Sequence, residues 1–342
     1  MKRILVITLV TALFVPALAA AQSITPSREE VIALTSNWTG ERFEDGRPKV
    51  PDSILERMKN VNIEEAWSVL RGKKFEWQYE GRWKLVHLDE TATMVGRALT
   101  ATFVPKRPDL DEALTKKGHE EGHVGGRNSW PIDMLQKGDV YVANAFGSFE
   151  GGPIIGGNLS TAIFKNSGNG VVFDGSVRDI AQMETIEGFN AWVRDWHPSY
   201  NYDNMLVSIN RPTRIGDSTV LPGDVVLAKR GGVMFIPAEL AEEVCKTGEL
   251  VQLRDMFGFQ RIKEGTYTPG EIDQRWTDPM EKDFSQWLEE HMDKLPVPKE
   301  QIQELLKERT WRAVPSSSTS VPWRDGHYHP RLSAGVGGIS SQ

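Results

Sequence analysis

The chain has 342 residues, of which 39% are hydrophobic, and its formal net charge is −7 at pH 7. This acidic balance argues against a general nucleic-acid partner, because polyanion-binding proteins need clustered positive charge. Cys245 is the single cysteine, so no disulfide can form within the chain, and the neighbouring acids disfavour a catalytic thiolate.

The first 21 residues have the three parts of a secretory signal peptide. A positive pair, Lys2-Arg3, precedes an apolar run that continues to Leu18, and three alanines ending at Ala21 form a small-residue cleavage site. The run is too short to span a bilayer comfortably and contains Pro16, although a retained anchor is the alternative. We therefore expect a signal peptide at 1–21, cleavage after Ala21, and a periplasmic or secreted protein without membrane contact.

The remaining chain changes character twice. Residues 22–60 are polar with a few apolar anchors and are expected to form an N-terminal helical arm. Residues 61–275 mix helix-spaced and strand-like apolar patterns, which predicts an α/β domain. An acid followed by proline at 278–279 is a typical helix start, so we expect C-terminal helices over 276–312. The Ser-, Gly- and Pro-rich residues 313–342 are typical of a disordered tail.

Within the predicted α/β domain the apolar patterns give the order of the elements. Residues 93–104 predict a strand that prolines end, and the charged, glycine-rich residues 109–130 predict a loop or a broken helix. Residues 170–174 are apolar on both faces, as in a strand buried within a sheet. Further strands are predicted at 139–143, 207–210, 225–228 and 233–237, and helices at 63–70, 156–166 and 238–245.

His119-Glu120-Glu121-Gly122-His123 matches the H-E-x-x-H pattern of zinc proteases. That chemistry needs both histidines on one face of a helix, with the glutamate beside them as general base. Glycines within and around the motif disfavour such a helix, and no apolar periodicity surrounds it. We therefore interpret the motif as a solvated loop.

Glycines crowd the segment 146–159, which follows one predicted strand and leads into a predicted helix. Glycine lets the backbone approach a ligand closely, and the N–H groups at a helix start attract an anion. A small carboxylate or phosphate would suit this segment, and a merely flexible loop is the alternative. The glycines are Gly147, Gly151, Gly152, Gly156 and Gly157.

Arg178-Asp179 follows the predicted buried strand at 170–174. Ligands of α/β proteins bind at the carboxyl ends of strands. The guanidinium of Arg178 suits a carboxylate, and the carboxylate of Asp179 is a hard oxygen ligand for Mg²⁺ or Mn²⁺. A surface ion pair is the alternative, but together with the glycine segment the pair favours a binding site.

Two of these motifs, Gly156-Gly157-Asn158-Leu159 and the run from Gly170 to Asp179, resemble the RraA-like family. Stretches at 94–100, 137–140 and 214–237 agree, so the resemblance covers roughly residues 60–250. The family includes metal-dependent 4-hydroxy-4-methyl-2-oxoglutarate aldolases and RraA regulators of RNase E, and its members were formerly labelled demethylmenaquinone methyltransferases.

The resemblance implies a swivelling-domain α/β sandwich, to which the arm and the C-terminal helices are additions. It also implies a homotrimer or a dimer of trimers with sites between subunits. By the same resemblance, Asp179 holds a divalent metal, Mg²⁺ or Mn²⁺, and Arg178 contacts the substrate. The loop Gly156, Gly157, Asn158 and Leu159 holds the substrate carboxylate, and Arg178 and Asp179 are the catalytic residues.

The chemistry expected from the resemblance is a lyase reaction of the aldolase or decarboxylase type on a small 2-keto acid. Breaking a C–C bond beside the keto group leaves an enolate, which positive charge stabilises. The sequence departs from the aldolases where they carry acids, at Gly157 and Gln182 and before Gly231; Glu150 and His197 are possible substitutes for proton transfer. Two alternatives stay open: a non-catalytic binding or regulatory protein, and a hydratase or epimerase of a sugar-derived acid.

Overall fold

The computed structural model describes residues 23–87 and 92–308. The predicted signal peptide and the predicted tail at 313–342 lie outside the described residues. The chain divides into two compact units, and the second begins at Asp278. Each unit is described by itself.

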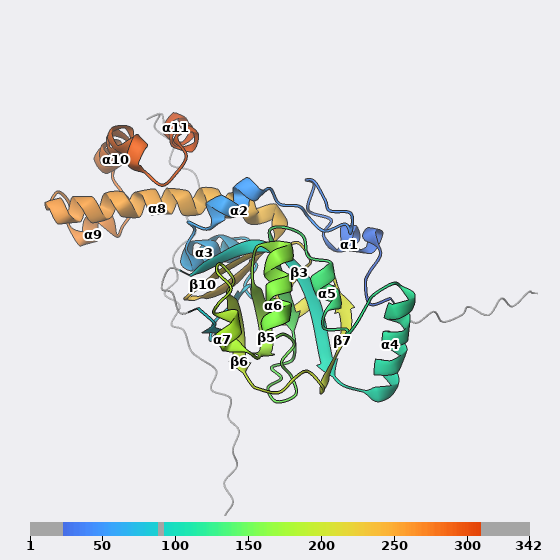
Figure 1. The fold of residues 1–342 in the computed structure, drawn as a ribbon. Coiled ribbons are helices and arrows are strands. Elements are labelled where there is room, and N and C mark those ends of the chain that lie inside the picture. Colours follow the sequence, from blue (N-terminus) through green and yellow to red (C-terminus); the bar gives the residue numbers. More distant parts are fainter. Residues whose placement is uncertain (1–22, 88–91, 309–342) are drawn as a thin grey trace, which may run out of the picture. The chain divides into compact units, whose positions relative to one another are not determined.

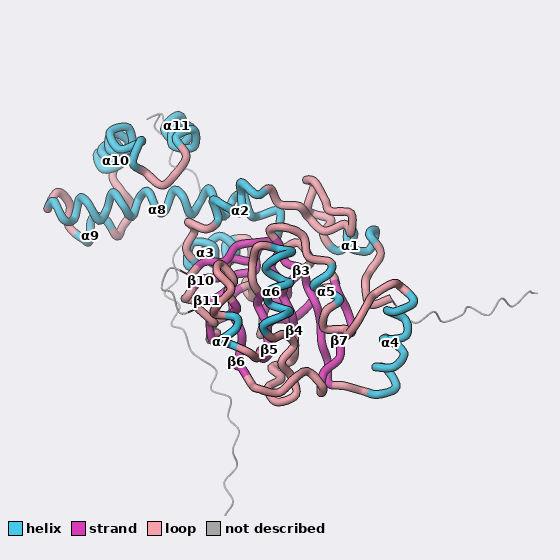
Figure 2. Tube along the Cα trace, in the orientation of Figure 1, coloured by secondary structure: helices cyan, strands magenta, loops and turns pink. Residues whose placement is uncertain are grey.

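A large mixed sheet forms the centre of the first unit (Figures 1 and 2). Its strands are β1 (Tyr79–Glu80), β2 (Lys84–Leu85), β3 (Thr93–Pro105), β4 (Asp139–Asn144), β5 (Val171–Val177), β6 (Ala191–Trp196), β7 (Asn204–Ile209), β10 (Val225–Lys229) and β11 (Gly232–Ile236). The strand order is β1-β11-β10-β3-β4-β5-β6-β2, and β7 pairs with the second half of β3. The central strands β3 to β6 are parallel and the outer pairings are antiparallel, so the predicted α/β class is confirmed.

The sheet curls around one of its own faces. Met94 and Ala98 of β3, together with Val226 of β10 and Trp192 of β6, belong to one buried cluster. The indole N–H of Trp192 donates to the carbonyl of Lys229 in β10 over 3.0 Å, although β3, β4 and β5 separate the two strands in the sheet order. A hairpin of β8 (Thr213–Ile215) and β9 (Ser218–Val220) contributes Ile215 and Val220 to the same cluster.

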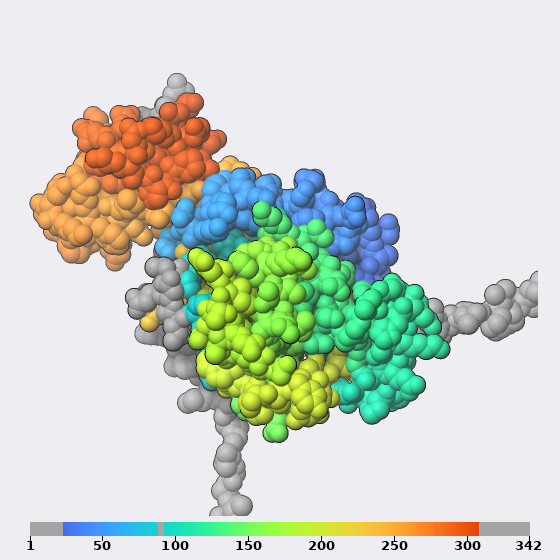
Figure 3. Space-filling view, in the orientation of Figure 1, coloured from blue at the N-terminus to red at the C-terminus, as the bar shows by residue number. Residues whose placement is uncertain are grey.

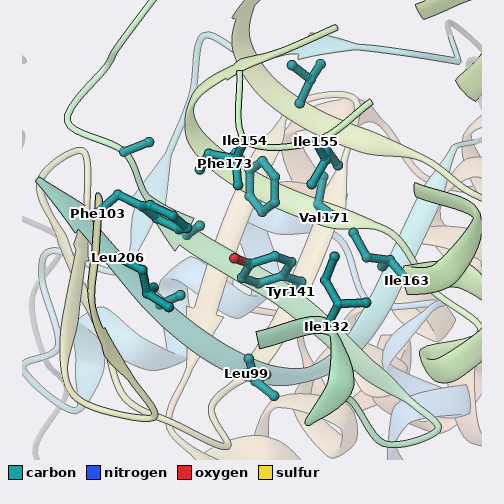
Figure 4. Close-up of a cluster of buried hydrophobic side chains, with 14 of the residues drawn as sticks. Leu99, Phe103, Ile132, Tyr141, Ile154, Ile155, Ile163, Val171, Phe173 and Leu206 are labelled. Carbon is teal, nitrogen blue, oxygen red and sulfur yellow. The ribbon is translucent and has the colours of Figure 1, made fainter. Parts of the chain in front are cut away.

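Helices cover the other face of the sheet. The helices of the first unit are α1 (Arg28–Leu34), α2 (Asp52–Met58), α3 (Ile63–Gly72), α4 (Pro108–Glu120), α5 (Trp130–Asp133), α6 (Gly157–Ser167), α7 (Ile180–Met183), α8 (Ala241–Glu264) and α9 (Pro269–Ile272), with a 3₁₀ turn at Ala238–Leu240. Ile132 of α5 and Ile163 of α6 pack with Leu99, Tyr141 and Val171 of the central strands (Figure 4). The helices α2, α3 and α8 cover β10 and β11 in a second cluster.

Residues 109–130, predicted as a loop or a broken helix, contain the regular helix α4. Pro108 occupies its first turn with Asp109 and Asp111, which is a favourable helix start. Gly118 lies inside this helix because a larger residue would clash there: a Cβ would lie only 2.2 Å from the ring of Trp130. The glycine therefore allows close packing, a long-range reason that the local pattern does not contain.

The predicted helix at 238–245 is the beginning of a much longer one, because α8 continues to Glu264. The strand β6 was not predicted, since its charged Arg194 and Asp195 interrupt the apolar pattern. In the predicted arm, two helices of seven residues each, α1 and α2, are joined by a segment of turns with an isolated bridge between Arg42 and Pro48.

The second unit contains α10 (Asp278–His291), a 3₁₀ turn (Met292–Lys294) and α11 (Lys299–Glu308). As predicted, α10 begins at Asp278, and Phe284, Trp287 and Leu288 form its buried stripe. Within residues 23–87 and 92–308, no helix is long and apolar enough to cross a membrane.

Candidate functional site

The start of α6 is built from two adjacent glycines. Gly156 caps the helix in an extended conformation, and the hydroxyl and amide of Ser160 both donate to its carbonyl. A Cβ on Gly156 would lie 2.2 Å from Oδ2 of Asp179, and a Cβ on Gly157 would lie 2.1 Å from Oε1 of Gln182. Only glycine at both positions lets these two polar side chains reach the end of the helix.

Asp179 follows β5 and caps the short helix α7. Its backbone is left-handed, with φ 61° and ψ 41°. This conformation is uncommon for residues other than glycine, and among those aspartate, asparagine and histidine adopt it most often. The amide of Gly157 donates to Oδ2 of Asp179 over 3.3 Å, and Nε of Arg178 lies 3.7 Å from the same oxygen. The end of β5 and the start of α6 therefore present one carboxylate and one guanidinium side by side.

These groups lie in a pocket of about 560 Å³. Of the predicted site residues, Gly156, Asn158, Leu159, Arg178 and Asp179 line it. Gly157 is buried directly beside Gln182, which also lines the pocket.

The far wall of the pocket comes from two loops that the sequence did not indicate. Asn128 lies in the connection between α4 and α5, and its amide nitrogen donates to the carbonyl of Ile154 over 2.9 Å. Tyr200 and Asn201 lie in the connection between β6 and β7. Figure 1 shows this connection at the same end of the sheet as the start of α6, and Figure 3 shows it in yellow beside the green α6 region.

The two possible substitutes for the missing acid do not line the pocket. Glu150 is exposed. Nδ1 of His197 is 2.9 Å from the hydroxyl of Ser199, which in turn accepts the amide of Gly151 over 2.8 Å, and the His197 ring packs edge-on against Phe149. His197 thus fastens the glycine segment to the connection between β6 and β7, as a structural residue does.

Asp174, in the motif that carries the resemblance, also has a structural role. Its Oδ1 pairs with Nε of Arg194 over 2.7 Å, and its Oδ2 accepts the amide of Gly216 over 3.1 Å.

The H-E-x-x-H pattern does not form a zinc site. The helix α4 ends at Glu120, so His119 lies in its last turn and His123 lies beyond it. Both rings pack against Trp130, with centroid distances of 5.8 and 4.8 Å. The rejection of a protease stands, although the first part of the motif is helical and not a loop.

The oxygen atoms of the pocket suit a magnesium-like ion better than a zinc ion. Among the described residues no three His, Cys, Asp or Glu side chains gather in a metal-binding group. Asp179 supplies the carboxylate of the pocket, and Oε1 of Gln182 lies at the same helix start. Mg²⁺ is commonly held by one or two carboxylates and keeps several water ligands, so this donor set fits it.

The sheet and this pocket together describe a class of protein: an α/β protein in which a helix start suited to an anion lies beside an Arg-Asp pair. Residues 72–235 match the RraA-like family, described as Aldolase/RraA, so the chain contains an RraA-like domain. The family contains lyases and also regulators of RNase E.

Solved structures with a TM-score above 0.5 show the same fold at low sequence identity. One described as novel cellulases from microbes associated with the gut ecosystem is 21% identical, with a TM-score of 0.52 over 68% of this chain and 96% of that chain. An uncharacterized protein from Pseudomonas syringae pv. tomato is 19% identical, with a TM-score of 0.52 over 66% and 100% of the two chains. RraAS2 of Streptomyces coelicolor, an unusual member of the RNase ES inhibitor RraA family, is 22% identical, with a TM-score of 0.49 over 63% and 98%.

Proposed function

We propose that this protein is a divalent-metal-dependent lyase that cleaves or decarboxylates a 2-keto acid through a pyruvate-enolate-like intermediate. The observation that supports it is the joint position of Arg178, Asp179 and the start of α6 in one pocket. The match of residues 72–235 to the RraA-like family supports the same class of reaction.

The start of α6 binds the substrate carboxylate in this proposal. The first N–H groups of a helix have no partner within the helix, and the helix dipole favours an anion there. Because the amide of Gly157 is turned toward Asp179, the amides of Asn158 and Leu159 are the donors left for the substrate.

Arg178 stabilises the charge that develops during the reaction. When the C–C bond breaks, its electron pair moves into the keto acid and negative charge grows on the keto oxygen. A guanidinium fixed next to that oxygen stabilises the charge more in the transition state than in the ground state. The backbone amide of Arg178 donates to the carbonyl of Ile155 over 3.1 Å, which fixes the base of this side chain.

Asp179, with the amide oxygen of Gln182 nearby at the start of α6, would hold Mg²⁺ or Mn²⁺. When bound, the ion supplies a Lewis acid for the keto oxygen. Gly156 keeps the carboxylate of Asp179 accessible, since any side chain at that position would meet Oδ2.

Three further expectations belong to this proposal. The signal sequence supports export to the periplasm or beyond, with cleavage after Ala21. The family resemblance supports a homotrimer or a dimer of trimers. The partner is then a small carboxylate, and neither nucleic acid nor a membrane is required.

The test follows pyruvate release from oxaloacetate and from 4-hydroxy-4-methyl-2-oxoglutarate by chelator-treated protein, before and after adding Mg²⁺ or Mn²⁺. We expect release only with metal, and a loss of about 100-fold or more in kcat for Arg178→Ala, because one transition-state donor is worth that much. Asp179→Ala should lose both turnover and metal affinity. Arg71→Ala, an exposed arginine at the end of α3, is the matched control and should be unaffected.

A non-catalytic binding protein is the second candidate, favoured by one observation: Asp179 is the one acid among the side chains that line the described pocket. Metal-loaded protein that binds a 2-keto acid in an Arg178-dependent manner, yet releases no pyruvate, would support this candidate against the lyase.

A further inference from the structure

Four side-chain amides surround the pocket and outnumber its charged groups. They belong to Asn128, Asn158, Gln182 and Asn201. Each lies in a different element: the connection after α4, the first turn of α6, the helix α7 and the connection after β6. A ligand in the pocket is therefore within reach of amides from several sides.

A side-chain amide offers both donors and an acceptor, which matches a hydroxyl group that also donates and accepts. Asn128 uses its nitrogen for the carbonyl of Ile154, which leaves its oxygen for a ligand. The oxygen of Asn201 is buried and has no hydrogen-bond partner among the described residues. Buried polar atoms normally have partners, so this amide has hydrogen-bonding capacity that the protein leaves unused beside the pocket.

An exposed aromatic ring completes the polar wall. Tyr200 lines the pocket and is 65% exposed, and the ring of Tyr202 supports it edge-on at a centroid distance of 5.2 Å. An exposed ring held in place in this way offers an apolar face and a polar tip, as in many binding sites. Amides that bind hydroxyls and a ring that packs against C–H groups together suit a polyhydroxylated carbon chain.

We propose that the substrate of this site is a sugar-derived acid, whose carboxylate binds at Arg178 and the start of α6 and whose hydroxyls bind Tyr200 and the amides of Asn128, Asn158 and Asn201. The placement of the carboxylate rests on the proposed function. The pocket volume agrees, since about 560 Å³ lies within the range of sites for ligands much larger than pyruvate.

Calorimetric titration of the full metal-loaded protein with gluconate and with hexanoate tests this proposal. The two acids have the same charge and chain length and differ in their hydroxyl groups. We expect gluconate to bind at least about tenfold more tightly, because several hydroxyl contacts each contribute a factor of about five. Tyr200→Phe, which removes only the ring hydroxyl, and Asn201→Ala should each weaken gluconate binding about fivefold and leave hexanoate binding unchanged. Asn60→Ala, an exposed asparagine after α2, should change neither.

Equal affinities for the two acids, tighter binding of hexanoate or no binding of gluconate would overturn the proposal. Oxaloacetate turnover by the same preparation separates this inference from the proposed function. Turnover without a preference for gluconate refutes the sugar-derived substrate and leaves the lyase intact. A preference for gluconate that depends on Tyr200 and Asn201, without pyruvate release, supports the substrate class and refutes the pyruvate-enolate reaction.

Discussion

At Gly157 the chain lacks the acid that the resemblance leads one to expect, and the structure shows what occupies its place. A Cβ added at position 157 would lie 2.1 Å from Oε1 of Gln182 and 2.9 Å from the Cβ of Gln182. The two positions are therefore coupled, since the glycine is required as long as Gln182 lies over the start of α6. Restoring an acid at 157 alone would displace a side chain that lines the pocket.

We expect Gly157→Ala to lower the free energy of unfolding by about 1–3 kcal/mol, because the added methyl group overpacks against Gln182. Adding Gln182→Ala should recover part of this loss, and a double-mutant cycle in urea measures the coupling. Gly72→Ala is the control: nothing lies within 4 Å of a Cβ at this position at the end of α3, so it should be neutral or stabilising by up to about 1 kcal/mol. Equal losses for the two substitutions would contradict the coupling.

At the scale of elements, ion pairs of two buried arginines join the N-terminal arm to the sheet. Nη2 of Arg47 pairs with Asp139 at the start of β4 over 2.9 Å, and both side chains are fully buried. Arg97 of β3, itself 2% exposed, pairs with Asp52 of α2 over 2.6 Å and donates to the carbonyl of Val50 over 2.9 Å. The arm, which lies outside the matched family domain, thus supplies partners for charges that the sheet buries.

We expect Arg47→Met to cost about 3–5 kcal/mol of stability, because Asp139 would be left as a buried charge without its main partner. Lys49→Met, which removes an exposed pair with Glu41, should cost at most about 1 kcal/mol. Urea denaturation measures both, and limited proteolysis should cut the arm faster in Arg47→Met alone. Similar losses for both variants would mean that the buried pair does not fasten the arm.

At the scale of the whole molecule, Asp224 makes stability depend on pH. Burial raises the pKa of this carboxyl to about 8; nearby Glu239 adds to the shift, and the amide of Leu221, which donates to Oδ2, opposes it. The ordinary pKa in the unfolded chain is about 3.9. Between these values the folded state keeps a proton that the unfolded state has lost, so the contribution of Asp224 to stability falls as pH rises from about 4 to about 8.

We expect Asp224→Asn to remove this fall while keeping an oxygen for the amide of Leu221. The variant should therefore gain stability relative to the wild type as pH rises from 5 to about 8, and the gain should level off above that pH. Guanidinium denaturation of both proteins across this range gives the difference, in which the other titrating groups cancel. A difference that does not change with pH would show that Asp224 is ionised throughout.

Cys245 illustrates a residue whose character the sequence did indicate. It is buried, and burial raises the pKa of its thiol to about 12. Glu242, one of the acids that precede it in the sequence, raises the pKa less than burial does, and the expectation of an unreactive thiol agrees with this environment.

The sequence by itself determined the features that rest on neighbours along the chain. The strands around β3, β4 and β5 follow from apolar patterning, the start of α6 from adjacent glycines, and the Arg178-Asp179 pair from its place directly after a strand. These segments also carry the family resemblance, so the sequence indicated the half of the pocket that α6 and β5 form.

Tertiary structure alone decided the other half of the pocket. Asn128, Tyr200 and Asn201 lie in connections without a recognisable pattern, and only folding brings them to α6. The same holds for Gly118, whose place inside α4 depends on Trp130, and for Asp224, whose pKa depends on burial. In each case the deciding contact joins residues through space, whereas periodicity and capping record only what adjacent residues do to one another.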